Sequence, residues 1–185
     1  MSRHLMILAI MVSALALVAS TAAAQPTGQP ERSGFWASFG LGIGSMGLED
    51  HPDDERTGGG TVMVELGGTV NERLLLGGGI HGWAREDSDW DATLALTTVT
   101  FMARFYPMID NGLHLKGGIG FGGIEADLGP MNGSDEGGGA ILGAGFDVPI
   151  GQSWNFTPFL TLAAVSTDGG VDANFNQFGL GLTYH

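Results

Sequence analysis

Charged side chains are rare in the apolar and Gly-rich segments of this sequence, and the few that occur there could pair with one another. A charge that is removed from water is costly unless it is paired and hydrogen-bonded. We therefore expect an internal ion-pair network in which one glutamate binds one or both of two cations. Two histidines in similar segments, His81 and His114, can contribute to it. The charged residues of this predicted network are Glu65, Arg104, Lys116 and Asp147.

The densest acidic cluster of the sequence falls between two such segments, over residues 49–55. Carboxylate oxygens at close spacing are the kind of ligand that Ca²⁺ prefers. The cluster lacks the D-x-[DN]-x-[DN]-G-x₅-E spacing of an EF-hand loop. A solvated acidic loop is therefore the expectation, and no metal site is predicted. The acidic residues of this loop are Glu49, Asp50, Asp53, Asp54 and Glu55.

Nucleophilic catalysis needs a histidine within reach of a nucleophile and an acid. His81, followed by Asp87 and Ser88, comes nearest to that combination, and its spacing matches no catalytic motif. The Gly-x-Gly-x-Gly run at 118–122 lies in the middle of a predicted strand, whereas a phosphate-binding loop lies between a strand and a helix. The sequence therefore predicts no catalytic residues and no cofactor, and indicates a protein that is not an enzyme.

The elements that must position these residues begin after a leader. Arg3 precedes an almost wholly apolar stretch, residues 5–18, and small residues that end in Ala22-Ala23-Ala24 follow it. This order is typical of a secretory signal peptide with its cleavage site. We predict a signal peptide over residues 1–24, a short linker over 25–33 and one domain over 34–185.

The composition of the mature chain narrows its partners. The whole chain has 7 Lys or Arg against 20 Asp or Glu, and removal of the leader with Arg3 takes its formal charge from −13 to −14. Such an acidic balance argues against nucleic acid as a partner. The chain has no cysteine, so an exported form must be held together without disulfides. Its 33 glycines alternate with large apolar residues, which argues against low-complexity disorder.

Hydrophobic residues recur with period two, which is a strand signal. The fourth strand changes phase, because Leu94 and Leu96 oppose Val99 and Phe101, and a β-bulge near residues 97–98 would reconcile its two halves. Eight strands are predicted over residues 35–45, 61–70, 73–84, 92–106, 113–124, 139–148, 154–165 and 175–185.

The predicted connections alternate in length and composition. Those after the second, fourth and sixth strands are short turns, and the other four are longer, acidic and Gly-rich. Short periplasmic turns and longer extracellular loops are typical of outer-membrane barrels. The longer connections are predicted over residues 48–60, 85–91, 125–138 and 166–174.

The face opposite the apolar one is dominated by glycine with a few charges, which suits a narrow interior better than a solvated exterior. Eight strands close into a barrel that side chains just fill, and closure leaves no edge strand with unpaired backbone groups. The predicted fold is therefore all-β, an eight-stranded antiparallel up-and-down transmembrane β-barrel whose apolar face meets lipid. A soluble exported β-barrel is the alternative, and it would need bulky apolar residues inside and more charge outside.

The last strand, with Phe178-x-Leu180-x-Leu182-x-Tyr184, resembles the C-terminal targeting strand of outer-membrane proteins, except that His185 follows the aromatic residue. With the signal peptide and the alternation, it makes the chain similar to the small eight-stranded outer-membrane β-barrels of Gram-negative bacteria, such as the membrane domain of outer-membrane protein A. This resemblance implies a monomer in the outer membrane with both termini periplasmic. It also implies contact with outer-membrane lipid and lipopolysaccharide, and recognition of the last strand by the barrel-assembly machinery.

The function expected from these features is a structural or surface-interaction role through the acidic extracellular loops. A narrow porin-like channel for small solutes and an outer-membrane lipid-modifying enzyme remain alternatives. The predicted charge network bears on the first of them, because it could line a gated polar pore or fill the barrel with salt bridges. An eight-stranded barrel leaves little free bore, so the sequence favours the second reading.

Overall fold

A computed structural model describes residues 32–48, 56–87, 92–127 and 132–185 of the chain. The predicted signal peptide and the acidic residues 49–55 lie outside this described part. The described residues contain no helix of the length and apolarity that a bilayer crossing requires. They form the strands β1 Phe35–Leu48, β2 Thr57–Asn71, β3 Leu74–Asp87, β4 Ala92–Phe105, β5 Leu113–Asp127, β6 Asn132–Phe146, β7 Val148–Pro149, β8 Trp154–Thr167 and β9 Asp172–Tyr184.

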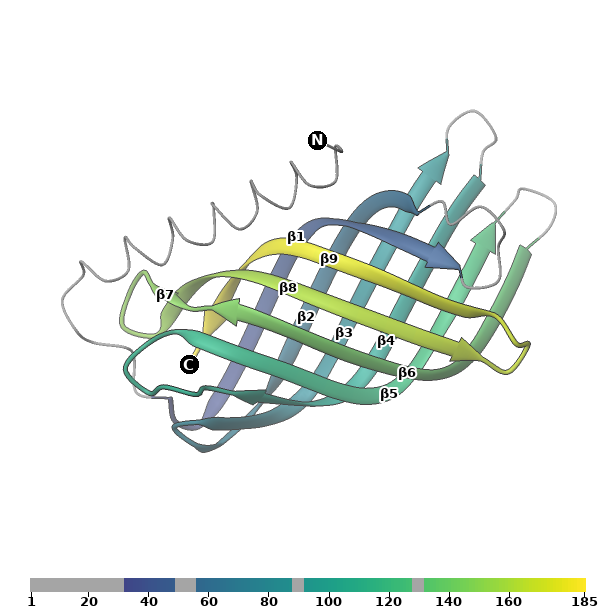
Figure 1. The fold of residues 1–185 in the computed structure, drawn as a ribbon. Coiled ribbons are helices and arrows are strands. Elements are labelled where there is room, and N and C mark those ends of the chain that lie inside the picture. The colour runs from purple at the N-terminus through teal and green to yellow at the C-terminus, as the bar shows by residue number, and fades with distance from the viewer. Residues whose placement is uncertain (1–31, 49–55, 88–91, 128–131) are drawn as a thin grey trace, which may run out of the picture.

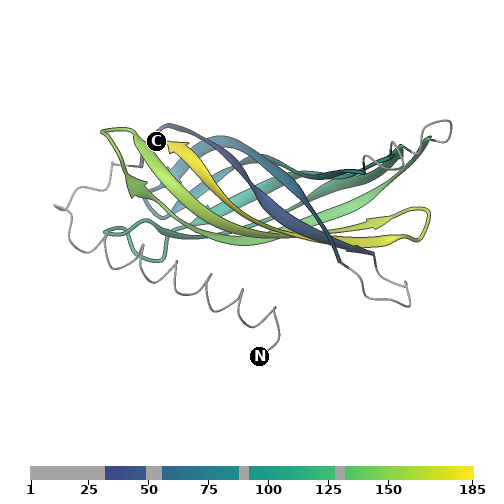
Figure 2. The ribbon, with the colours of Figure 1, turned by 90° about the horizontal axis from the view of Figure 1, so that it is seen from above.

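The strands form one closed antiparallel sheet, as predicted (Figure 1). Strands adjacent in sequence pair with each other, and β1 closes the ring by pairing with both β2 and β9. Leu41, for example, lies opposite Val62 on β2 and Leu180 on β9. The view from above shows the strands crossing obliquely around a common axis (Figure 2). Each long strand of the described chain pairs with a neighbour on both sides, so the ring has no edge strand, as a bilayer requires.

Strands β6 and β7 together form one strand of the barrel wall, which is interrupted at Asp147. Gly145 lies opposite Phe159 of β8, and Val148 lies opposite Phe156, so the register is the same on both sides of the break. In this register Asp147 faces Thr157, and Pro158 faces Phe146 just before the break. Pro158 has no N–H and cannot donate a ladder hydrogen bond there. The barrel wall therefore has the predicted eight strands, although the described residues divide into nine strand segments because β6 and β7 are counted separately.

The two ends of the barrel differ. The terminal end, as we call it, carries the start of β1, the end of β9 and the turns at 72–73, 106–112 and 150–153. The loop end carries Leu48, Thr57, Thr167 and Asp172, where the other connections begin or finish. At the loop end, Gly170 adopts φ +82° in the turn between β8 and β9, a conformation that L side chains rarely adopt.

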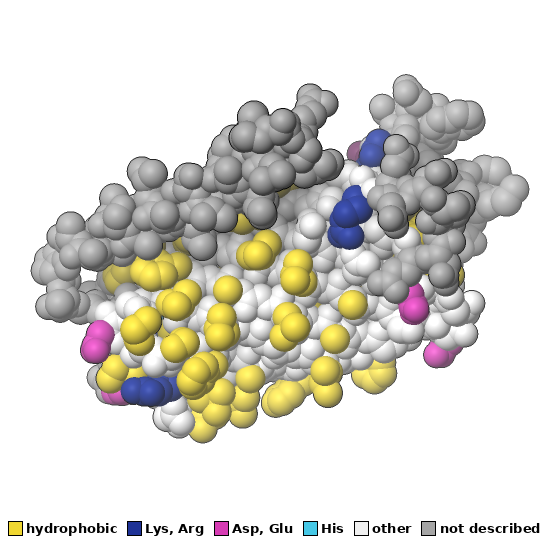
Figure 3. Space-filling model, viewed as in Figure 1, with side chains coloured by type: hydrophobic (Ala, Val, Ile, Leu, Met, Phe, Trp, Pro, Cys, Tyr) yellow, Lys and Arg dark blue, Asp and Glu magenta, His cyan; other side chains and the backbone are white. Residues whose placement is uncertain are grey.

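The outer wall between the two ends is apolar. Ile43, Ile119 and Phe121 are more than 70% exposed, at 72%, 74% and 77%. In Figure 3 the hydrophobic side chains gather over the wall, and charged side chains lie towards the two ends. At the terminal end, Trp154 and Tyr184 stack edge to face with ring centroids 5.4 Å apart. An apolar band bordered by aromatic residues is the lipid-facing surface of an outer-membrane barrel, so the predicted inside-out alternation is confirmed.

The predicted β-bulge in the fourth strand is wrong. β4 pairs with β3 and β5 in one continuous register through residues 97–98. Leu96 is fully buried and Leu94 partly buried, and both pack in the barrel interior, whereas Val99 and Phe101 face outward. The phase never slips. The interior is apolar at the loop end, so an alternation of polar and apolar residues cannot identify the inward face there.

The extent of the predicted long connections is also wrong, because the strands continue into them. Strand pairing uses backbone N–H and C=O groups, so glycine and polar residues extend the ladder beyond the apolar band. Glu125 and Ser134, for instance, are paired residues of β5 and β6. The segments that belong to strands are 57–60, 85–87, 125–127, 132–138, 166–167 and 172–174.

Candidate functional site: the polar interior

The interior near the terminal end contains a buried cluster of one carboxylate and two cations. Arg104 on β4 and Lys116 on β5 lie directly opposite each other across the turn at 106–112. Glu65 reaches them from β2: its Oε2 accepts a hydrogen bond from Arg104, and its Oε1 accepts one from Lys116 Nζ at 2.5 Å. All three side chains are at most 1% exposed. The structure thus brings together three of the four charged residues singled out in the sequence.

Apolar and polarisable groups enclose this cluster. The guanidinium of Arg104 lies 4.6 Å from the ring centroid of Trp36, and Lys116 Nζ lies 5.2 Å from that of Phe159. A Cβ added at Gly143 would lie 2.9 Å from Lys116 Cε, so glycine at this position makes room for the lysine side chain. Charge-assisted bonds are strong in such a water-poor setting, so the cluster ties three strands together across the interior.

His81 lies on the loop-end side of the same cluster. Its Nε2 is 3.4 Å from Glu65 Oε1, and the imidazole is fully buried. His81 therefore faces a glutamate inside the barrel. Of the two residues considered together with it, Asp87 ends β3 and Ser88 lies outside the described residues.

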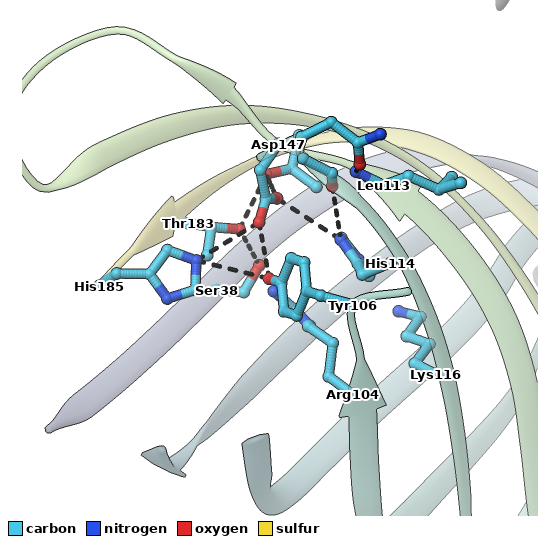
Figure 4. Close-up of polar contacts among 12 residues, drawn as sticks. Ser38, Arg104, Tyr106, Leu113, His114, Lys116, Asp147, Thr183 and His185 are labelled. Carbon is cyan, nitrogen blue, oxygen red and sulfur yellow. Dashed lines mark hydrogen bonds and ion pairs between the residues drawn. The ribbon is translucent and has the colours of Figure 1, made fainter. Parts of the chain in front are cut away.

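Asp147 forms a second buried cluster next to the first (Figure 4). Its Oδ2 accepts a hydrogen bond from the Tyr106 hydroxyl at 2.7 Å, and its Oδ1 accepts one from Thr157 at 2.7 Å. His185 Nε2 lies 3.3 Å from Oδ2, and His114 Nδ1 lies 3.7 Å from Oδ1. Asp147 lies in the break between β6 and β7, and its backbone N–H donates to Gly112 O at 2.9 Å.

Figure 4 also shows Ser38 and Thr183 beside the Asp147 cluster, pointing inward with the Tyr106 hydroxyl. The hydroxyls of Ser38 and Thr183 are 2.8 Å apart, and those of Thr157 and Thr183 are 2.9 Å apart. These hydroxyl residues were not among the predicted site residues. Ser38, Thr157 and Thr183 do occupy the inward phase of their strands, so a polar residue at such a position was an available signal.

Arg32 closes the terminal end of the interior from the segment predicted as a linker. It donates hydrogen bonds to Ile109 O at 3.3 Å and Asn111 O at 2.9 Å, and its guanidinium lies 3.7 Å from the ring centroid of Tyr106. The side chain is only 5% exposed. This contact could not be predicted from the sequence, because residues that precede the first strand have no strand phase.

The interior near the loop end is filled differently, by apolar side chains. All belong to one cluster with exposures of 3% or less. Here the apolar side chains contact one another by packing, and Trp83 Nε1 also donates a hydrogen bond to Gly44 O at 3.4 Å. Its members at this end are Met46, Trp83, Leu96, Ile141, Ala163, Val165, Ala173 and Phe175, with Leu48, Leu94 and Ile124 packed against them.

Among the residues that the structure describes, no group of three or more His, Asp or Glu side chains is arranged to hold a metal ion. The buried clusters connect side chains of different strands and occupy space inside the wall.

A closed wall of eight strands that is apolar outside and filled by side chains inside defines a small integral β-barrel of an outer membrane. The chain belongs to the outer membrane protein beta-barrel domain family, which matches residues 12–185. The protein is therefore an outer-membrane protein, and the soluble alternative does not hold.

Two solved structures show the same fold. Ail, the attachment invasion locus protein of Yersinia pestis, in complex with the heparin analogue sucrose octasulfate, is 16% identical, with a TM-score of 0.58 over 82% of this chain and 99% of that one. Neisserial surface protein A is 12% identical, with a TM-score of 0.57 over 82% of this chain and 97% of that one. No match is found among curated protein sequences.

Proposed function

We propose that this protein is a closed scaffold of the outer membrane that presents an acidic surface to partners and conducts no solutes. The observation that supports a closed barrel is the filled interior. Buried side chains occupy both of its halves: the ion pairs of Glu65 at the terminal end, and Trp83 and Phe175 at the loop end. Eight strands leave little bore beyond what such side chains fill.

A planar-bilayer conductance measurement tests this proposal. The folded barrel is expected to give no steady channels, with heat-modifiable gel migration as the check that the inserted protein is folded. Glu65→Gln changes the interior, and Glu136→Gln makes the same chemical change on the exposed loop end. Steady wild-type channels that Glu65→Gln alters and Glu136→Gln leaves unchanged would show that the interior is a pore and would refute the closed scaffold.

The orientation that we propose places both termini in the periplasm and the loop end at the cell surface. The short turns and both ends of the described chain occur at one end of the barrel, which is the expected periplasmic arrangement. Protease added to intact cells should then cleave at the loop end and leave the terminal end protected. Cleavage at the turns 106–112 or 150–153 in intact cells would reverse the orientation.

The partner chemistry that the loop end favours is cationic. Acidic side chains recur there beyond the apolar band, including Glu86, Glu125, Asp135, Glu136 and Asp168. A sulfated ligand such as the one bound by Ail would meet repulsion at this surface, whereas a basic partner would be attracted over about a Debye length. Vesicles that carry the protein should bind polylysine-coated beads, and should do so less well after neutralisation of Glu125 and Glu136. Preferential binding to heparin-coated beads would contradict the proposal.

Two further expectations depend on the outward face of β9. Phe178, Leu180, Leu182 and Tyr184 point outward along this strand, and Leu180 and Leu182 are about half exposed, at 51% and 45%. We propose that the barrel-assembly machinery recognises this apolar edge before the ring closes against β1, and that the finished barrel is a monomer. Deletion of residues 178–185 should leave the exported chain unassembled in the periplasm.

A further inference from the structure

The outer wall is not uniformly apolar, because a polar cluster lies on it at the upper limit of the apolar band. Three outward-facing residues form this cluster on adjacent strands: Ser45 on β1, and Asn174 and Asn176 on β9. Asn176 Oδ1 accepts hydrogen bonds from the backbone N–H and the hydroxyl of Ser45 at 2.9 and 3.1 Å. Polar groups at this level of a lipid-facing wall stand where lipid headgroups begin.

Arg56 lies flat against this cluster and is held there by three hydrogen bonds. Its Nε donates to Ser45 Oγ at 3.0 Å, its Nη2 to Ser45 O at 2.7 Å, and its Nη1 to Asn174 Oδ1 at 2.6 Å. A Cβ at Gly47 would lie 3.0 Å from Nη1, so glycine there lets the guanidinium rest on the wall. The side chain remains exposed although it is fixed. A guanidinium has five N–H donors, and three of them are used among the described residues.

A groove of about 450 Å³ runs from Arg56 down the wall over β6, β8 and β9. Its floor is made of small residues, since Ala140 and Ala164 lie opposite each other on β6 and β8. The next outward pair on the same strands is Leu142 and Leu162, which are 67% and 52% exposed and border the groove towards the middle of the wall. The groove is therefore apolar along its length and cationic at its loop end.

This combination fits one class of ligand, a lipid with a phosphate on its headgroup. Phosphate oxygens match the planar fork of arginine, and an acyl chain suits a shallow groove lined by alanine and leucine. Among the described residues, three arginines are exposed: Arg56 lines this groove, while Arg73 and Arg85 lie elsewhere on the barrel. In the orientation proposed above, the loop end lies in the outer leaflet, whose phosphorylated lipid is a glycolipid.

We propose that this groove is a binding site for a phosphorylated glycolipid of the lipopolysaccharide type. One phosphate binds the guanidinium of Arg56, the amide of Asn174 lies beside the headgroup, and one acyl chain lies over Ala140 and Ala164. The site rests on the proposed orientation, and it makes one sector of the outer wall specific for a lipid.

The experiment measures retention of defined lipids by the detergent-solubilised mature chain, using native mass spectrometry. The probes are bis-phosphorylated lipid A, the same lipid without phosphates, and phosphatidylglycerol. Wild-type protein should retain the phosphorylated glycolipid in preference to the other two. Arg56→Gln should weaken that binding by about tenfold, because loss of one charge-assisted contact corresponds to at least about 1.4 kcal/mol.

A matched pair of variants tests each part of the site. Ala164→Leu fills the floor and should lower retention, whereas Ala144→Leu adds the same volume further down β6, outside the groove. Arg73→Gln removes the same charge at the terminal end and should leave retention unchanged. Both control residues lie outside the groove lining, and substitutions on the lipid-facing wall leave the interior packing intact.

Several results would overturn the proposal. These are equal retention by wild type and Arg56→Gln, equal retention of the dephosphorylated lipid, or equal effects of Ala164→Leu and Ala144→Leu. Binding of phosphatidylglycerol as tight as that of lipid A would refute the assignment to a glycolipid. Heat-modifiable migration separates this failure from failure of the proposed function. A folded barrel without lipid preference refutes only the site, and a chain that never folds into membranes refutes the scaffold.

Discussion

The two halves of the barrel interior are enclosed by the same wall but filled by opposite chemistry. At the terminal end, one carboxylate holds two cations, and Asp147 collects hydroxyl and imidazole groups around it. At the loop end, apolar side chains such as Trp83, Leu96 and Phe175 fill the interior, mainly by packing. One hydrogen bond, from Trp83 Nε1 to Gly44 O, accompanies it. Ion pairs require matched charge and direction, whereas packing requires volume. We infer that the terminal half specifies how the strands are arranged, and that the loop half tolerates variation.

This difference fits the surroundings of each half. Strand segments that extend beyond the apolar band surround the loop half. A change in the loops, or a bound partner, therefore contacts this half of the barrel first. The terminal half adjoins the aromatic pair of Trp154 and Tyr184 and the turn that Arg32 covers. The hydrogen-bonded polar interior holds the strands of the terminal end in one arrangement. Both ends of the described chain lie at this end of the barrel.

The largest effect on stability is expected from Glu65→Gln. A small effect would contradict the inference that the polar half determines how the strands are arranged. The substitution leaves Arg104 and Lys116 buried next to each other without their carboxylate. Removal of one partner from a buried ion pair costs about 3–5 kcal/mol, so the free energy of unfolding should fall by that amount. Urea unfolding of the barrel in lipid vesicles, followed by gel migration, measures it. Glu136→Gln, exposed on the loop end, is the control and should change stability by less than about 0.5 kcal/mol.

Removal of one cation should have a smaller effect than removal of the shared carboxylate. Lys116→Met keeps a long unbranched side chain, and Glu65 retains its bond to Arg104. The loss of a hydrogen bond to a charged group costs about 1.5–3 kcal/mol. The same unfolding assay would show this, and a cost equal to that of Glu65→Gln would mean that the lysine, and not the glutamate, organises the cluster.

The sequence already allowed much of this cluster to be anticipated. Arg104 and Lys116 share the inward phase of two strands joined by a short turn, so they could be expected to face each other. Period-two alternation identified the inward face of Glu65 as well. The partners of Asp147 could not be found in this way. Apart from His114 on β5, they come from β8, the residue after β9 and the turn after β4. Only the register of the closed ring brings Thr157 and His185 to one carboxylate.

The failure at Leu94 and Leu96 has a different cause. Alternation identifies a face only when the two faces differ in polarity, and at the loop end both faces are apolar or small. Strand ends were misplaced for a related reason. The residues beyond the apolar band are glycine and polar, as loop residues are, yet the neighbouring strands continue and provide hydrogen-bond partners for their backbone groups.

Glycine-to-alanine substitutions on the inward and the outward face of the wall test whether glycine is needed to keep the interior narrow. An inward Cβ at Gly42 would lie 2.2 Å from the carbonyl oxygen of Phe178, so Gly42→Ala must displace backbone and should cost about 1–3 kcal/mol. An outward Cβ at Gly60 meets nothing within 4 Å. Gly60→Ala should be neutral or stabilise by up to about 1 kcal/mol, because the unfolded chain loses freedom. Equal costs would mean that glycine does not serve to narrow the interior.

Apart from the control substitutions, the smallest effect is expected from Leu96→Met in the apolar half, and this change tests the comparison of the two halves most directly. Leucine and methionine have similar volumes, and such exchanges in packed interiors usually cost less than about 1.5 kcal/mol. Lys116→Met places the same residue in the polar half of the same barrel, so the two variants differ only in what methionine replaces. If both cost the same in the unfolding assay, the two halves constrain the fold equally. A lower cost for Leu96→Met means that directed ion pairs, more than filled volume, determine the arrangement of the strands.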